Sequence, residues 1–260
     1  MTAPTNNDTR ALADIPLFDP NTLKCPYHYD ALLRQQNPVY QDPASGVFVI
    51  ANYELVREVH RNDAIFSNEF TLALGSATEL DADVKAAMAN TYNLGRGTLL
   101  TVDDPDHKAY RDTVKDFFLA KNIERYRPWV SDLAQRLVSD IPSGEPIDFI
   151  ETFASPLPLS VIMHVLGMPL TMIESAFRWT VANVTVLSQV SDKPTLLQAF
   201  ADVKEEYDWF AQALQERRQA PRDDLLSVVA NATIDGRPLT IEEQLGHCTQ
   251  FLVAGNETTT

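Results

Sequence analysis

The last seven residues of the chain, Ala254 to Thr260, combine small, acidic and hydroxyl side chains in one short segment. A glycine inside a helix costs about 1 kcal/mol relative to alanine, so Gly255 requires a packing or functional reason. The carboxylate of Glu257 stands beside the hydroxyl of Thr258, on a helix that is otherwise largely apolar. An acid beside an alcohol could deliver protons to a group that lies against the helix.

Helical periodicity adds further members to this candidate site. Residues four apart share a helix face, so Gln250, Ala254 and Thr258 form one stripe. Val253 and Glu257 form the neighbouring stripe. A threonine hydroxyl can bond the carbonyl one turn back, which would leave a dent lined by hydroxyl and carboxylate. Helix packing through small residues, with Glu257 exposed, explains the same spacing equally well.

Gln250 is the unusual polar member of the first stripe. An amide one turn before Ala254 could bond a polar group of a substrate, and packing against another helix is the alternative.

A second candidate site begins at Asp104-Pro105-Asp106 and includes His107 and Arg111. These two residues are four apart, so both point to the same side of a helix that Asp104-Pro105 starts. The helix dipole favours anions near this end, and the two side chains together form a clamp for carboxylates or phosphates. A solvated surface pair is the alternative, and for an isolated His-x-x-x-Arg spacing it is the more frequent one.

Basic side chains continue on the same helix. Lys108 and Lys115 share one side with Asp112, in a chain whose net charge is −15 from 21 basic and 36 acidic residues. Such a basic patch could dock an acidic partner protein, and a solvated face is the alternative. The overall acidity disfavours nucleic acid as the main partner, because phosphate binding needs a basic surface.

Several other classes lack support in the sequence. There is no Gly-x-Ser-x-Gly elbow, no Gly-x-Gly-x-x-Gly loop and no phosphate-binding loop. The two cysteines, Cys25 and Cys248, show no zinc spacing and predict no disulfide. No stretch approaches 18 consecutive apolar residues, and residues 1–20 show no signal-peptide layout. We therefore expect no membrane span, a disordered leader over residues 1–20 and a cytoplasmic location.

The elements that must position these residues are mostly helices. The pattern predicts a short hairpin around Pro38–Gln41 and Val47–Ile50, followed by a helix that Asn52 caps. From Asp104 onward the chain is predicted helical nearly throughout. The expected helices run over about 104–118, 128–140, 157–166, 171–186, 194–218, 223–231 and 240–260, with a turn at 235–238. Thr240 and Glu243 form a capping box at the start of the last helix.

Four segments in chain order resemble the cytochrome P-450 family of haem-thiolate monooxygenases, in its soluble bacterial form. They are Pro38 to Val59, Asp104 to Arg111, Asp223-Asp224-Leu225-Leu226 and Ala254-Gly255-Asn256-Glu257-Thr258-Thr259. The last matches the family's [Ala/Gly]-Gly-x-[Asp/Glu]-Thr-[Thr/Ser] oxygen-binding motif. The resemblance implies a mainly α fold with a small N-terminal β-sheet, and a haem-dependent enzyme that inserts one atom of O2 into a small organic substrate.

The resemblance also implies roles for individual residues. His107 and Arg111 would bind the propionates of haem b, and Ala254 and Gly255 would lie over the haem. Glu257 and Thr258 would be catalytic, as proton relay and as hydrogen-bond donor to oxygen. Gln250 and Val253 would contact the substrate. A ferredoxin-type protein would supply electrons at the basic patch that includes Lys108 and Lys115, and the protein is expected to be a monomer.

Two family features are missing, since the sequence has neither the later Glu-x-x-Arg helix nor the Gly-rich loop with the proximal cysteine. Residues 21–260 are therefore expected to form the N-terminal part of a single haem-monooxygenase domain, truncated after the oxygen-binding motif, without the metal's protein ligand and inactive alone. An all-α ligand-binding or sensor module with an anion clamp, and a non-catalytic scaffold, are the alternative classes.

Overall fold

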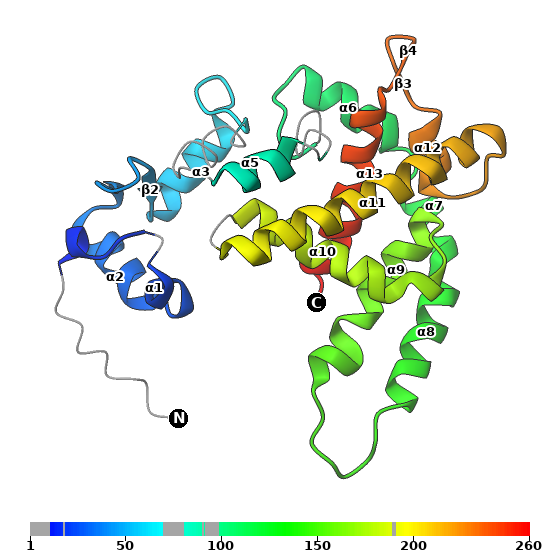
Figure 1. Ribbon diagram of the computed structural model, residues 1–260, viewed down its shortest axis with the longest axis horizontal. Coiled ribbons are helices and arrows are strands. Elements are labelled where there is room, and N and C mark those ends of the chain that lie inside the picture. Colours follow the sequence, from blue (N-terminus) through cyan, green and yellow to red (C-terminus); the bar gives the residue numbers. More distant parts are fainter. Residues whose placement is uncertain (1–10, 18, 70–80, 90, 92–98, 189–190) are drawn as a thin grey trace. The chain divides into compact units, whose positions relative to one another are not determined.

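Helices form most of the computed structural model, which describes residues 11–17, 19–69, 81–89, 91, 99–188 and 191–260. Contacts divide the chain into two units, residues 1–79 and 80–260, and each is described by itself (Figure 1). Among the helices that the structure describes, none has the length and apolar character that crossing a membrane requires.

The smaller unit consists of short helices and one hairpin. In chain order these are a 3-10 turn at Leu12–Asp14, α1 (Pro20–Lys24), α2 (Tyr27–Gln36), β1 (Val39–Gln41), β2 (Phe48–Ile50) and α3 (Tyr53–Arg61). The strands are antiparallel, with Tyr40 opposite Val49. The side chain of Asn52 accepts hydrogen bonds from the backbone N–H groups of Glu54 and Leu55 and so caps α3. The predicted hairpin and capped helix are therefore confirmed.

The core of the smaller unit reaches further towards the N-terminus than the sequence predicted. Leu12 and Ile15 are buried together with Tyr29, Leu33 and Tyr40. Their spacing of three residues puts both apolar side chains on the same side of a single turn. The disordered leader expected over residues 1–20 therefore does not include these two side chains, and residues 1–10 lie outside the described part.

The larger unit contains the two candidate sites. Its helices are α5 (Ala82–Ala89), α6 (Asp106–Val114), α7 (Ala120–Ile123), α8 (Arg127–Ser139), α9 (Pro156–Leu166), α10 (Ile173–Ser188), α11 (Lys193–Gln219), α12 (Leu225–Ala230) and α13 (Ile241–Glu257). Short turns of 3-10 helix lie at Glu124–Tyr126 and Leu170–Met172, and a π-helical turn lies at Ile150–Ala154. A second hairpin joins β3 (Thr233–Ile234) to β4 (Arg237–Pro238).

Helix α13 is surrounded by its neighbours. It packs against α9, α10, α11 and α12, and α11 also packs along α10 (Figure 1). The largest fully buried side chains of this core include Trp179, Phe210 and Leu252. Burial on several sides fixes where the polar residues of α13 can point.

Local capping explains where the principal helices begin. Thr240 and Glu243 form the predicted capping box, in which each side chain bonds the backbone of the other residue. Asp192 caps α11 by accepting from the backbone N–H of Thr195, and Asp224 caps α12 in the same way through Ser227. These sequence-local signals account for the agreement between the predicted and observed helices.

Candidate functional site

Gly255 lies at the contact between α13 and α9. A Cβ atom at this position would stand 2.7 Å from Cγ1 of Ile162, which is closer than non-bonded carbon atoms approach. The glycine thus permits two helices to pack closely, as the packing interpretation of the motif predicted. Its absent side chain faces α9, and therefore the contact with α9 is sufficient to explain the glycine.

Asn256, the next residue, faces a different helix. Its side chain is 1% exposed and its Nδ2 donates a hydrogen bond of 3.1 Å to Oγ1 of Thr180 on α10. The last turn of α13 is therefore held on one side by α9 and on another by α10.

The remaining motif residues point outward. Ala254, Glu257 and Thr258 are exposed, and the Thr258 hydroxyl donates to the carbonyl oxygen of Ala254 at 2.8 Å. This is the predicted bond to the carbonyl one turn back. The helix-packing and the proton-delivery interpretations thus each describe part of the motif. Gly255 serves packing, while an acid and an alcohol lie on an accessible helix face.

Gln250 and Val253 are each partly exposed on the adjoining part of α13. The Oε1 atom of Gln250 is itself buried and has no hydrogen-bond partner among the described residues. A buried acceptor without a partner costs about 1–3 kcal/mol, so this amide is an unusual component of the helix.

Individual side chains of α6 and of the segment that follows it contact α13. The Tyr110 hydroxyl donates to Oε1 of Glu243 at 2.6 Å, and Arg237 donates to both oxygens of the same carboxylate at 2.9 Å. Beyond the end of α6, the Phe118 ring lies 5.2 Å from the Phe251 ring. The residues that follow Phe251 on α13 are those of the acid–alcohol motif.

The electrostatics of this junction follow from its hydrogen bonds. Arg237 first, and then Tyr110 and the backbone of Thr240, lower the pKa of Glu243 to about 2. Burial, followed by the bond to Glu243, raises the pKa of Tyr110 to about 12. Burial also lowers the pKa of His247, whose Nδ1 lies 2.9 Å from the Glu243 carbonyl oxygen. The junction therefore carries a permanently ionised carboxylate, a neutral phenol and a neutral imidazole at neutral pH.

The anion clamp of His107 and Arg111 lies on α6. His107 is half-exposed, and its Nδ1 is 3.5 Å from Oδ1 of Asp104. Arg111 is exposed and makes no side-chain hydrogen bond or ion pair within the described residues. The structure shows no contact between either described side chain and the exposed motif residues of α13, so the two candidate sites lie on adjacent helices without touching.

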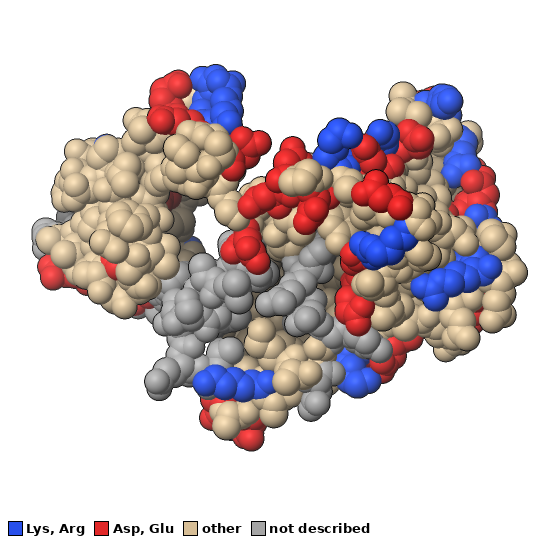
Figure 2. All heavy atoms as spheres, turned by 90° about the horizontal axis from the view of Figure 1, so that it is seen from above, with Lys and Arg blue, Asp and Glu red and all other residues tan. Residues whose placement is uncertain are grey.

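The basic patch of Lys108 and Lys115 is partly neutralised. Both ammonium groups bond Asp112, at 2.9 and 2.8 Å, and these two bonds lower the pKa of Asp112 to about 2. The three side chains therefore carry a net charge of +1. On the right of Figure 2, which includes the larger unit, basic and acidic side chains are interspersed.

A buried polar cluster between α10, α11 and α13 was not predicted from the sequence. Glu206 is fully buried, and Asn183 Nδ2 donates to its Oε2 at 2.6 Å. Burial raises the pKa of Glu206 to about 8, against the smaller opposing effects of Asn183 and Thr249. The signal was present, because Glu206 follows Val203 by three residues and precedes Phe210 by four, on the apolar face of α11.

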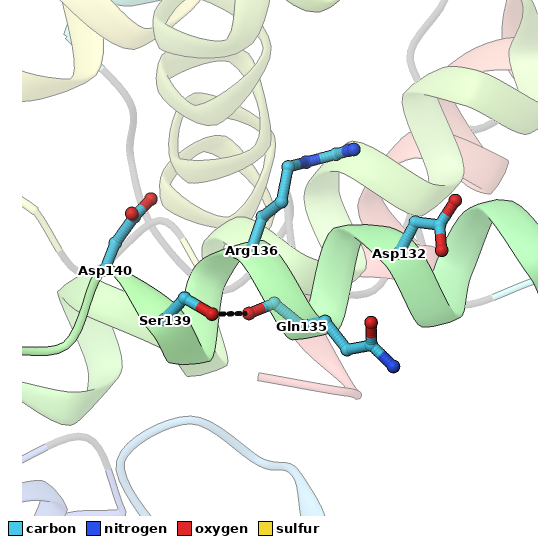
Figure 3. A pocket seen from close by; sticks show the side chains of 5 residues that line it. All are labelled: Asp132, Gln135, Arg136, Ser139 and Asp140. Atoms are coloured by element: carbon cyan, nitrogen blue, oxygen red, sulfur yellow. Dashed lines mark hydrogen bonds between the residues drawn. The ribbon is translucent and has the colours of Figure 1, made fainter.

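A surface hollow of about 420 Å³ lies away from these residues, along α8, and is lined by Asp132, Gln135, Arg136, Ser139 and Asp140. Figure 3 shows that the five side chains come from α8 and from Asp140 directly after it, and that the Ser139 hydroxyl bonds the carbonyl of Gln135. A groove with one wall offers no enclosed binding site.

No family model matches the chain. Curated proteins do match it, and each covers most of the chain. The erythromycin C-12 hydroxylase of Saccharopolyspora erythraea is 31% identical over 88% of this chain and 53% of its own length. Cytochrome P450 109 of Bacillus spizizenii is 31% identical over 89% and 52%. Linalool 8-monooxygenase of Pseudomonas putida is 28% identical over 92% and 59%. The chain thus spans about half the length of the curated relatives that it matches.

Solved structures of cytochromes P450 also match most of the chain. A mutant of P450 EryK in complex with erythromycin B has a TM-score of 0.72 at 28% identity and covers 93% of this chain and 57% of its own. Cytochrome P450 CYP109Q5 of Chondromyces apiculatus has a TM-score of 0.71 at 27% identity, with 95% and 58% covered. The mainly α fold with a small antiparallel sheet is that of these cytochrome P450 structures. The chain belongs to the cytochrome P450 family.

Haem b is the cofactor of this family, and the described residues can be compared with what it needs. The exposed methyl group of Ala254 adds little bulk to its helix face, and the guanidinium of Arg111, which has no ion-pair partner among the described residues, is available to a carboxylate. Both features fit the cofactor.

Cys248 is fully buried, and burial together with the nearby Glu206 raises the pKa of its thiol. Cys25 is exposed and lies in the smaller unit.

Proposed function

We propose that the whole protein is a haem-dependent monooxygenase that inserts one atom of O2 into a small organic substrate. One structural observation supports this activity in addition to membership of the family. The last turn of α13 keeps Gly255 and Asn256 packed inward and leaves Ala254, Glu257 and Thr258 accessible. A carboxylic acid and an alcohol on one open helix face are the groups that proton delivery to a bound oxygen species requires.

Each predicted residue receives a role in this proposal. Arg111 and His107 bind the haem propionates, with Arg111 supplying an exposed cation and His107 a half-exposed ring. Ala254 and the main chain of Gly255 form the helix surface over the haem, with Ala254 as the exposed member. When bound, haem supplies an iron centre that activates oxygen. Glu257 brings protons from solvent, and Thr258 holds a proton at its hydroxyl.

The substrate class is open within small organic molecules. The relatives are named for reactions on an erythromycin, on linalool and on methyl-branched lipids, so membership of the family does not select one. We assign Gln250 and Val253 to the substrate side of α13, because both are partly exposed next to Ala254.

A ferredoxin-type protein supplies the electrons in this proposal and docks at the basic patch of Lys108 and Lys115. The local charge of +1 in a chain of net charge −15 supports docking there. A monomeric state and a cytoplasmic location complete the proposal.

The absorption spectrum of the whole protein, reduced and exposed to carbon monoxide, tests the proposal. A thiolate-ligated haem gives a strongly red-shifted Soret band, and we expect that band in the wild type. Arg111→Leu should lower the haem content of the purified protein, whereas Arg136→Leu on the exposed face of α8 should not. A protein that binds anions through Arg111 but shows no thiolate-type spectrum would instead be the anion-binding module.

A further inference from the structure

The contact between Asn256 and Thr180 joins the acid–alcohol motif to α10. Asn256 occupies the variable position of the motif, between Gly255 and Glu257. Thr180 lies 76 residues earlier in the sequence and is fully buried. A polar pair with both members buried is expensive unless each group is satisfied, so its hydrogen bonds are informative.

These hydrogen bonds have a defined direction. The Thr180 hydroxyl donates its hydrogen to the Phe177 carbonyl oxygen at 2.9 Å. Its oxygen is therefore left to accept, and it accepts from Nδ2 of Asn256 at 3.1 Å. A hydroxyl whose hydrogen is already donated within its own helix thus faces α13 as an acceptor through its lone pairs.

The backbone of Asn256 also organises the residues that follow. Its carbonyl oxygen accepts from the backbone N–H groups of Thr259 and Thr260, at 3.1 and 3.2 Å, and from the Thr260 hydroxyl at 3.0 Å. One residue therefore bonds α10 through its side chain and the end of α13 through its main chain.

The two inward contacts of the last turn differ in kind. Gly255 meets the apolar side chain of Ile162, and such a contact is steric and has no directional preference of its own. The bond from Asn256 to Thr180 is directional, so it sets the rotation of the turn about its axis. Glu257 follows Asn256 by about 100° and Thr258 by about 200° around the helix, so any rotation there redirects both.

We propose that Thr180 and Asn256 are a positioning pair, which holds the last turn of α13 in the rotation that presents Glu257 and Thr258 to the reacting oxygen. The pair touches neither substrate nor cofactor and acts through its neighbours. The proposal rests on the monooxygenase function proposed above. It extends that function to a residue of α10 and to the variable position of the motif.

The test uses the whole haem-loaded protein and measures product and peroxide formed per electron consumed. Thr180→Val keeps the shape of the side chain and removes the acceptor, so product per electron should fall at least threefold while peroxide rises. Thr180→Ser keeps the hydroxyl and should restore the wild-type ratio. Thr185→Val is the matched control, because the hydroxyl of the partly exposed Thr185 donates to the Val181 carbonyl within α10.

A second measurement does not depend on activity. Hydrogen exchange in the peptide that contains residues 256–260 should be about fivefold faster in Thr180→Val than in Thr185→Val, because one buried hydrogen bond is lost. In unfolding by urea, Thr180→Val and Asn256→Leu should each lower the midpoint, and the double variant should fall little further than the more destabilised single one.

The possible results of these experiments distinguish a failure of the positioning role from a failure of the proposed monooxygenase function. If wild-type protein forms product and Thr180→Val forms it with unchanged coupling and unchanged exchange, the positioning role is wrong and the monooxygenase proposal stands. If wild-type protein forms no product and shows no thiolate-type spectrum, the proposed function is wrong. Should Thr180→Val fail to fold, Asn256→Leu must show the same loss of coupling, and normal coupling in it would refute the pair.

Discussion

Thr258 presents its hydroxyl on the open face of α13 because its hydrogen bonds the Ala254 carbonyl. Thr258→Ala removes this hydroxyl without changing the packed side of the helix. Oxygen consumption should continue, while product per electron falls by about tenfold and peroxide rises, because a positioned proton donor is lost. Thr259→Ala, at the next exposed threonine, is the control. An unchanged product yield in Thr258→Ala would contradict the assigned role.

Gln250 combines a partly exposed side chain with a buried Oε1 atom that has no partner among the described residues. Gln250→Leu removes an unsatisfied acceptor, so the free energy of unfolding should stay the same or rise by about 1 kcal/mol. The affinity for a substrate with a hydrogen-bonding group should nevertheless fall about tenfold, as measured by equilibrium titration. Equal affinity in the two proteins would show that the amide serves packing alone.

Glu206 makes the stability of the protein depend on pH. Its pKa in the folded protein is about 8, compared with 4.5 for an exposed glutamate. The folded state therefore keeps a proton that the unfolded state releases, so stability is complete below about pH 4.5 and declines until about pH 8. From that shift the decline is on the order of 5 kcal/mol at most.

Glu206→Gln tests this pH dependence. The amide cannot ionise, so the variant should lose the decline in unfolding free energy between pH 5 and pH 8 that the wild type shows. The comparison is made by urea unfolding at several pH values. Glu216→Gln, which changes an exposed carboxylate on the same helix, should keep the wild-type slope. A similar slope in Glu206→Gln and wild type would show that Glu206 ionises normally.

At the scale of elements, the approach of α9 and α13 depends on Gly255. Gly255→Ala places a methyl group 2.7–3.0 Å from three atoms of Ile162, so the helices must separate. The strain of about 1–3 kcal/mol should exceed the gain of about 1 kcal/mol in helix propensity, and the urea midpoint should fall. Ile162→Ala removes two of the three contacting atoms. The double variant should therefore be more stable than the sum of the two single effects predicts.

The elements that the sequence predicted well are those with local causes. Asn52 and Thr240 cap their helices through residues two or three positions away, so their roles can be predicted from the adjacent sequence. The turn at 235–238 was also predicted, and it proves to be a hairpin in which Asp235 and Gly236 both have positive φ. β3 and β4 have two residues each, which is too short for the alternation of apolar and polar residues that predicts a strand.

The partners of the site residues could not be predicted in the same way. Tyr110 and Glu243 are 133 residues apart, and nothing local to either indicates the other. Gly255 was identified as unusual, but its cause, a single side chain on α9, depends on the packing of two helices. The sequence therefore indicated which residues of the motif mattered, whereas the direction in which each one points required the structure.

At the scale of the whole molecule, the net charge of −15 opposes the approach of an acidic electron donor. The patch of Lys108 and Lys115 can attract such a donor only through its local field, and Asp112 cancels one of its two charges. Because the pKa of Asp112 is about 2, it remains ionised at every pH where the protein is expected to work. Asp112 is therefore the residue that sets the strength of the patch.

Asp112→Asn should raise the rate at which an acidic ferredoxin reduces the haem-loaded protein, and Lys108→Gln should lower it. A severalfold change is expected in each direction at low ionic strength, measured by stopped-flow absorbance. Both effects should vanish towards 1 M salt, where the screening length is about 3 Å. Asp208→Asn makes the same change in net charge at the Lys204–Asp208 pair on α11. If it accelerates reduction as much as Asp112→Asn does, total charge governs the encounter and the donor does not dock at α6.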